Sequence, residues 1–162
     1  MTVTLPNRLV PDLSGMLAHA SHVLASQMSA AFVELGITPR AFCVLFHALE
    51  AERTQIELAE IADLDKTTMV VTVDELERLG LARRQPSSTD RRARIIAVTE
   101  AGEQAVAAGT KIADRVHRSV LDALPPGSRD GFAAALGLLV EGPLATPEES
   151  ARPVRRARQR RN

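Results

Sequence analysis

The joint between two short helical patterns, formed only by Asp63 and Leu64, is the feature that most constrains the fold of this chain. The pattern before the joint opens with a capping box made by Thr54 and Glu57. The pattern after it keeps apolar residues at helical spacing and ends at Gly80. Two helices joined by so few residues cannot lie antiparallel, so they must cross steeply. This stretch therefore predicts a helix-turn-helix.

The spacing of apolar residues changes immediately after this motif. Residues 81–85, "LARRQ", and residues 94–98, "RIIAV", have a period of about two, which is typical of strands. The segment between them, "PSSTDRRA", is rich in turn-forming residues. We therefore expect a β-hairpin directly behind the helix-turn-helix, the arrangement known as a wing.

Amphipathic helices are predicted on both sides of this region. Residues 12–35 carry an apolar stripe at helical spacing, and a second helix opens at Thr38, whose hydroxyl caps it. A long helix is expected over residues 99–124 and a last one up to Gly142. The expected fold class is mainly α with a small β-hairpin wing.

Charge is sorted along the sequence, although 20 Lys and Arg balance 20 Asp and Glu. Residues 83–94 hold five arginines and one aspartate, and residues 152–162 hold six arginines and no acidic residue. The rest of the chain is acidic. Such a separation is typical of a localised surface that binds an anionic partner.

The composition also argues against several classes of protein. No apolar run is long enough to span a bilayer, and the N-terminal residues lack the basic-then-apolar pattern of an export signal. The single cysteine, Cys43, excludes an intrachain disulfide and fits a reducing compartment. We expect a cytoplasmic protein with no membrane partner. Four Phe without Trp or Tyr argue against a stacking platform for single-stranded nucleic acid.

Residues 57–102 resemble the signature of the MarR (multiple antibiotic resistance regulator) family of transcription factors. The matching features are the leucine-alanine start of the first short helix, the "DKTT" helix start, the "LERLGL" exit into a strand, the "DRRAR" wing and "VTEAG". With the flanking helices, the resemblance covers roughly residues 12–141. An ordered signature of this length is far more specific than one short motif. It implies an obligate homodimer of winged helix-turn-helix subunits that regulates a promoter by binding double-stranded DNA.

The resemblance assigns roles to the segments of the chain. It implies a flexible segment over residues 1–11, an N-terminal dimerisation helix over 12–37, a DNA-binding domain over 38–99 and C-terminal dimerisation helices over 100–142. Residues 143–162 lack periodicity and are expected to form a disordered basic tail. The arginines of this tail either add nonspecific DNA affinity or do nothing specific.

The helix that begins at Lys66 is expected to enter the major groove. Lys66, Thr67 and Thr68 place donors at its N-terminus, which suits phosphates and base edges. The alternative is that Asp65 and Thr68 serve only as a cap.

Two valines on the outer side of this helix bear on the operator sequence. Val70 and Val71 are expected to point away from the core, and the family often has a polar or basic side chain near Val71. Valines can contact thymine methyl groups but cannot read guanine, so we expect an operator rich in A·T pairs. Alternatively, Val70 packs against the wing.

The arginines of the wing are expected to hold the duplex. Arg91, at the loop tip, is assigned to a minor groove, where narrow A·T stretches concentrate negative potential. Asp90 is expected to pair with Arg92 or Arg94 and so to hold the loop tip in shape. The other DNA contacts are assigned to the remaining arginines of the wing: Arg83, Arg84, Arg92 and Arg94. The alternative is a solvated, charged loop.

A small apolar or phenolic effector is expected between the dimerisation helices and the DNA-binding domain. Its binding would stabilise a dimer whose recognition helices no longer match the spacing of the groove. The walls of its pocket are assigned to Met16, Phe42, Phe46 and His47.

Two sensing roles and a protein-binding role are the alternatives. Cys43 and His47 are four residues apart on one helix, and His19 and His22 three apart on another, so a zinc site is conceivable. No HxxxH or CxxC motif supports it, and a free cysteine such as Cys43 is more often a buried apolar residue than a peroxide sensor. The arginine-bearing wing argues against a module that binds only protein. We expect no enzymatic activity, no cofactor and no metal.

Overall fold

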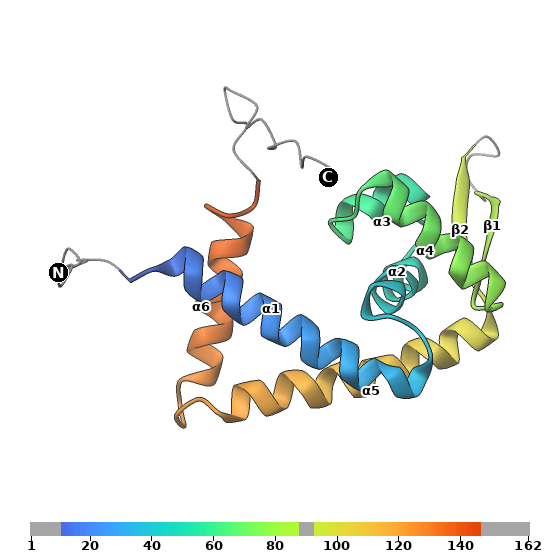
Figure 1. The fold of residues 1–162 in the computed structure, drawn as a ribbon. Coiled ribbons are helices and arrows are strands. Elements are labelled where there is room, and N and C mark those ends of the chain that lie inside the picture. Colours follow the sequence, from blue (N-terminus) through green and yellow to red (C-terminus); the bar gives the residue numbers. More distant parts are fainter. Residues whose placement is uncertain (1–10, 88–92, 147–162) are drawn as a thin grey trace, which may run out of the picture. The chain divides into compact units, whose positions relative to one another are not determined.

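The structure is a computed structural model that describes residues 11–87 and 93–146. It divides into two compact units, the first ending at Arg118 and the second starting at Ser119. The elements in chain order (Figure 1) are α1 Leu13–Phe32, the 3₁₀-helix η1 Val33–Leu35, α2 Pro39–Glu50, α3 Gln55–Ile61, α4 Lys66–Arg78, β1 Ala82–Pro86, β2 Arg94–Val98, α5 Glu100–Asp122 and α6 Arg129–Glu141. The predicted class, mainly helical with a two-stranded hairpin, is confirmed.

Side-chain caps fix where the helices of the first unit begin. The Thr38 hydroxyl accepts a hydrogen bond from the Ala41 N–H at 3.1 Å, with Pro39 in the first turn of α2. Thr54 and Glu57 form a complete capping box at the start of α3. Both caps are confirmed as the sequence predicts them.

The turn between α3 and α4 is tight. Asp63 takes a left-handed backbone conformation, with φ of 50°, which a short polar side chain tolerates better than a bulky one. The Leu64 N–H donates to the Ala59 carbonyl at 2.8 Å. This turn joins α3 to α4 through only four residues, so the predicted helix-turn-helix is confirmed.

The core of the first unit lies where α2 packs against α3, α4 and β2. Its largest fully buried side chains come from all of these elements and from the end of α1: Phe32, Val44, Leu45, Leu58, Met69, Val73, Leu76 and Ile96. Full burial of one such side chain contributes about 1.5–3 kcal/mol. Packing therefore fixes α4 and the hairpin to one rigid framework.

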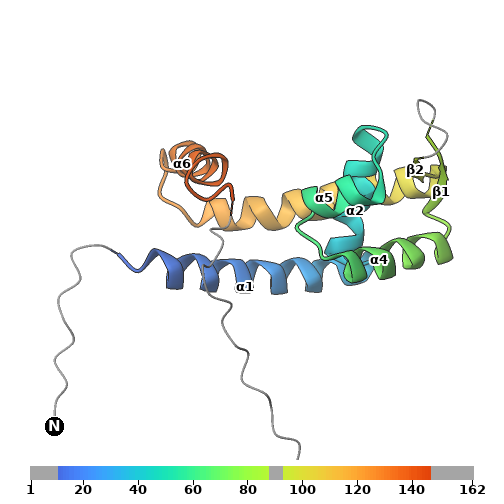
Figure 2. The same ribbon diagram turned by 90° about the horizontal axis from the view of Figure 1, so that it is seen from above.

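The hairpin is attached to this framework along one edge. β1 and β2 pair antiparallel, with Arg84 opposite Ile96. The Ile96 N–H donates to the Arg53 carbonyl at 3.1 Å, and Thr54 forms an isolated bridge with Ile95. The residues just before α3 thus extend the pairing of the hairpin. Figure 2 shows that the hairpin follows α4.

The joint between α4, the hairpin and α5 depends on two glycines. Gly80 ends α4 with φ of 70°, a conformation that favours glycine. At Gly102, an added Cβ would lie 2.0 Å from the Leu81 carbonyl oxygen, so only glycine fits there. Thr99 completes the joint, because its hydroxyl donates to the Gly80 carbonyl and accepts from the Gly102 N–H.

The second unit contains α6, none of whose residues is buried within a single chain. An ion pair of 2.6 Å between Asp122 and Arg129 connects the end of α5 to the start of α6. Phe132, Leu138 and Val140 are at least half exposed. These apolar side chains are therefore not covered within one chain.

Within the described ranges, no single helix is long and apolar enough to cross a membrane. The pair Leu13–Leu35 and Pro39–Glu50 meets the requirements of length and composition only when taken together, across a bend of 77°.

Candidate nucleic-acid interface

The N-terminus of α4 is held by Asp65. Its carboxylate accepts from the Thr68 hydroxyl at 2.6 Å and from the Thr68 N–H at 2.9 Å. These two bonds, the hydroxyl first, lower the pKa of Asp65 below its ordinary value. Because the Thr68 hydroxyl gives its proton to Asp65, the structure favours the capping role for Thr68 over base readout. Lys66 and Thr67 are exposed at the same end, where the helix dipole favours an anion.

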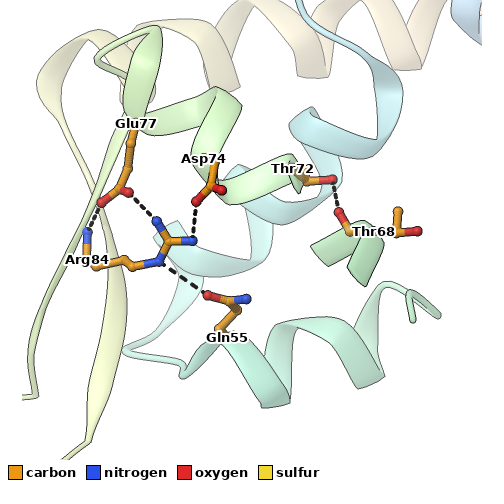
Figure 3. Close-up of polar contacts among 6 residues, drawn as sticks. All are labelled: Gln55, Thr68, Thr72, Asp74, Glu77 and Arg84. Carbon is orange, nitrogen blue, oxygen red and sulfur yellow. Dashed lines mark hydrogen bonds and ion pairs between the residues drawn. The ribbon is translucent and has the colours of Figure 1, made fainter. Parts of the chain in front are cut away.

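The outer face of α4 carries the two valines. Val70 is 36% exposed and Val71 62% exposed, whereas Met69 and Val73 are buried. The Thr72 hydroxyl is buried and donates to the Thr68 carbonyl at 2.8 Å (Figure 3). The predicted orientation of α4 is therefore confirmed, with both valines on the surface that a groove would meet.

Arg84 does not lie free on the wing. Its guanidinium reaches back to α4, where Nη2 is 2.7 Å from the Asp74 carboxylate and Nη1 pairs with Glu77. Its Nε donates to the Gln55 side-chain carbonyl on α3 at 3.3 Å, and its backbone N–H donates to Glu77 (Figure 3). Because carboxylates already hold the guanidinium, this internal network disfavours the expected phosphate contact, which stays a prediction. Arg84 connects β1, α4 and α3.

The other described arginines of the wing remain on the surface. Arg83 is exposed and its Nε donates to the Gln85 side chain at 3.3 Å. Arg94 is exposed at the opposite strand end, where it pairs in register with Pro86. Both stay candidates for phosphate contacts.

The loop tip lies outside the described residues. Asp90, Arg91 and Arg92 all fall in the range 88–92, so their predicted roles stay predictions.

The structure does not bring the four predicted effector residues together within one chain. Phe42 packs against Phe32 and Phe46, with ring centroids 5.1 and 5.9 Å apart, and the Phe46 ring meets His47 at 5.4 Å. Met16 precedes Phe32 by sixteen residues on a nearly continuous helix, which is about 24 Å of helical rise. The two phenylalanines therefore fill space beside the core, far from Met16.

A different set of residues surrounds an open cavity of about 540 Å³. Its lining combines apolar side chains of α1 with polar groups from α1, α2 and α5: Ser21, Leu24, Ala25, Met28, Ser29, Thr38, Pro39, Arg40 and His117. Such a mixture of apolar wall and a few polar groups is typical of small-molecule sites. Sequence reasoning missed this cavity, because its polar residues are distant in the chain and belong to no motif.

Neither sensing alternative gains support. Among the described residues, no group of three or more His, Cys, Asp or Glu is placed to hold a metal ion. Burial raises the pKa of the Cys43 thiol above its ordinary value, and this disfavours the reactive thiolate.

The fold and the surface together define a class of protein. Two short helices joined by a tight turn, a capped N-terminus and an exposed face on the second helix, and a hairpin with exposed arginines form a winged helix-turn-helix, the arrangement of DNA-binding proteins.

Comparisons with known proteins point to one family. Residues 35–93 match the model of the MarR family. CouR from Rhodococcus jostii RHA1, solved with p-coumaroyl-CoA, is 27% identical, with a TM-score of 0.72 over 82% of this chain and 94% of CouR. The transcriptional repressor CouR has also been solved on a 23-mer DNA duplex, with a TM-score of 0.70 and 27% identity over 83% of this chain and 92% of CouR. A MarR family regulator from Rhodococcus sp. RHA1 is 26% identical, with a TM-score of 0.73 over 82% and 95% of the two chains. The family model and these structural neighbours together support one assignment, a MarR family DNA-binding transcriptional regulator.

Proposed function

We propose that this chain is a ligand-responsive repressor that acts in the cytoplasm and binds a palindromic operator as a homodimer. In this proposal α4 enters the major groove, with Lys66 and Thr67 at its leading end. Arg83 and Arg94 neutralise phosphates beside it, and Arg91 enters a minor groove. The observation that carries the proposal is the placement, in one compact unit, of the exposed face of α4 next to the arginine-bearing hairpin.

The homodimer is supported by apolar surface that a single chain leaves uncovered. In the first unit, Leu13 and Met16 on α1 are 53% and 61% exposed. In the second unit, Phe132 and Leu138 on α6 are 50% and 72% exposed. Exposed apolar patches of this kind mark protein interfaces. A two-fold dimer then predicts half-sites about 10 base pairs apart.

The effector is a small molecule with an apolar body and at least one polar or charged group. The 540 Å³ cavity supports this chemistry, because Leu24 and Met28 supply apolar wall while Arg40 and His117 supply polar groups. That CouR was solved with p-coumaroyl-CoA is consistent with an aromatic acid or its thioester. The effector acts by favouring a dimer shape that no longer fits the operator.

Selection from a randomised pool of duplexes tests the proposal. We expect enrichment of an A·T-rich palindrome, bound with an affinity that falls steeply as salt rises. Footprinting should show two protected half-sites per dimer. Enrichment of a single asymmetric half-site at full affinity, or no enrichment at all, would overturn it. The latter result, together with capture of a protein partner that Arg83→Gln abolishes, would favour the protein-binding alternative.

A further inference from the structure

Arg40 stands between two concave surfaces of the first unit. It lies in the first turn of α2 and is exposed, and its guanidinium has no hydrogen bond or ion pair with the described residues. Its side chain lines the 540 Å³ cavity against α1 and α5, and it also lines a groove of about 240 Å³ against α4. The same positive charge therefore borders two sites.

The smaller groove belongs to the DNA-binding surface. Arg40 lines it together with Thr67, Val71 and Glu75 of α4. Thr67 and Val71 are on the face of α4 that the major groove would meet. An arginine at the border of this face is placed to hold a backbone phosphate through two parallel hydrogen bonds. Glu75 is the competing partner in the same groove.

The larger cavity offers the same guanidinium a different anion. Its apolar wall, represented by Leu24 and Met28, accommodates an apolar body. Arg40 is the permanently charged side chain in its lining, so a carboxylate or phosphate on a ligand would pair with it there. One guanidinium cannot hold an effector anion in this cavity and a DNA phosphate on the other side of α2 at the same time.

We propose that Arg40 couples effector binding to DNA release. In the DNA complex without effector, Arg40 neutralises a phosphate beside α4. An anionic group bound in the 540 Å³ cavity draws the guanidinium away from that phosphate. This inference rests on the proposed function and names the chemistry of its effector, an apolar molecule that carries a negative charge. Linkage makes the effect reciprocal, since DNA that holds Arg40 weakens binding of the effector by the same factor.

The DNA arm of the test compares wild type with Arg40→Gln and Arg40→Lys on the selected operator. A dimer that loses two phosphate contacts should bind about 10- to 30-fold more weakly at 0.15 M salt, and its salt slope should fall by about 2. Arg40→Lys should restore most of the slope, because it keeps the charge. An unchanged slope for Arg40→Gln would mean that Arg40 pairs with Glu75 instead of a phosphate, and would overturn the proposal.

The effector arm needs no knowledge of the natural ligand. Ser29→Glu places a carboxylate in the lining of the 540 Å³ cavity, and Ser29→Gln is its uncharged counterpart of the same size. Both lose the bond from the Ser29 hydroxyl to the Ala25 carbonyl, so their ratio isolates the charge. We expect Ser29→Glu to bind the operator about fivefold more weakly than Ser29→Gln when Arg40 is present, and as tightly as Ser29→Gln in the Arg40→Gln background.

Two outcomes of this cycle would contradict the coupling. If Ser29→Glu binds the operator more weakly than Ser29→Gln by the same factor in both backgrounds, the carboxylate acts on DNA directly. If the two variants bind equally in both backgrounds, the cavity does not control Arg40. Either result overturns the proposal. If Ser29→Glu does not fold, Ser21→Glu against Ser21→Gln repeats the cycle from the same cavity wall. If wild type binds no duplex at all, the proposed function fails rather than the coupling.

Discussion

Arg84→Met is expected to destabilise the first unit without removing a phosphate contact. Methionine keeps most of the apolar stem and removes only the guanidinium. That guanidinium is paired with Asp74 and Glu77, and the side chains of these three residues are 30%, 59% and 33% exposed. Exposed ion pairs contribute about 0.2–1 kcal/mol each. The partly buried pair with Glu77, the more exposed pair with Asp74 and the bond to Gln55 together predict a loss of about 1–2 kcal/mol.

Arg83→Met is the matched control, because Arg83 is the preceding residue of the same strand but is exposed and contacts only Gln85 among the described side chains. Its free energy of unfolding should change by less than about 0.5 kcal/mol. Its salt slope on the operator should instead fall by about 2 for the dimer, from one phosphate lost in each subunit.

Urea denaturation at one fixed protein concentration measures the stability of both variants, since the midpoint of a dimer depends on concentration. Operator affinity across a salt series gives the slopes. If Arg84→Met lowered the slope as much as Arg83→Met and left the urea midpoint unchanged, the reasoning would be refuted. The Arg84 guanidinium would then leave its carboxylates for a phosphate when DNA binds.

Three further changes test the framework around the site. The pKa of Asp65 is lowered in the folded protein, so its cap stabilises the fold above the pKa that Asp65 has in the unfolded chain. This stabilisation is lost as the pH falls through the pKa of Asp65 in the folded protein. Thermal melts of Asp65→Asn should therefore depend less on acid pH than those of wild type. Gly102→Ala should lower the free energy of unfolding, measured in urea, by about 2 kcal/mol, because the clash with the Leu81 carbonyl outweighs a helix-propensity gain of about 1 kcal/mol. The control Ala101→Ser should lower it by less than about 0.5 kcal/mol. Leu138→Asp on α6 should give monomer in sedimentation experiments, and a folded monomer that still bound the full operator would contradict the homodimer.

The local structure of this chain was predictable because its signals are local. The capping box of Thr54 and Glu57 and the cap at Asp65 each involve groups three residues apart, and the structure contains both. The two expected strands, 81–85 and 94–98, lie within one residue of β1 and β2. In all these cases a short stretch holds both the donor and the acceptor, or both the strand pattern and its turn.

The roles of individual arginines were not predictable in the same way. Arg84 meets Gln55 across 29 residues of sequence, and an arginine gives no sign in the sequence of whether its partner is a carboxylate or a phosphate. The acidic pair Asp74 and Glu77, three residues apart on α4, was the available signal. The assignment of Phe42 to an effector pocket meets a related difficulty, because an aromatic side chain gives no sign in the sequence of whether it faces a ligand or, as here, packs against another ring, that of Phe32.

The positive charge that the wing offers to DNA is therefore smaller than its number of arginines. Arg84 is offset by two carboxylates of α4, so its charge contributes little at the distance of a phosphate. Its ion pairs hold the strand that carries Arg83 against α4.

Successive residues turn by about 100° around α4, so Asp74 and Glu77 lie on one side of Val71 and Glu75 lies on the other. The wing approaches α4 from the first side through Arg84, and α2 approaches from the second through Arg40. A duplex that receives α4 in its major groove would meet the strand that Arg84 holds on one side and, on the other, an arginine that bonds to no described residue. Only the second can be drawn away without disturbing the wing, which is why control by a ligand is better placed at Arg40 than in the hairpin.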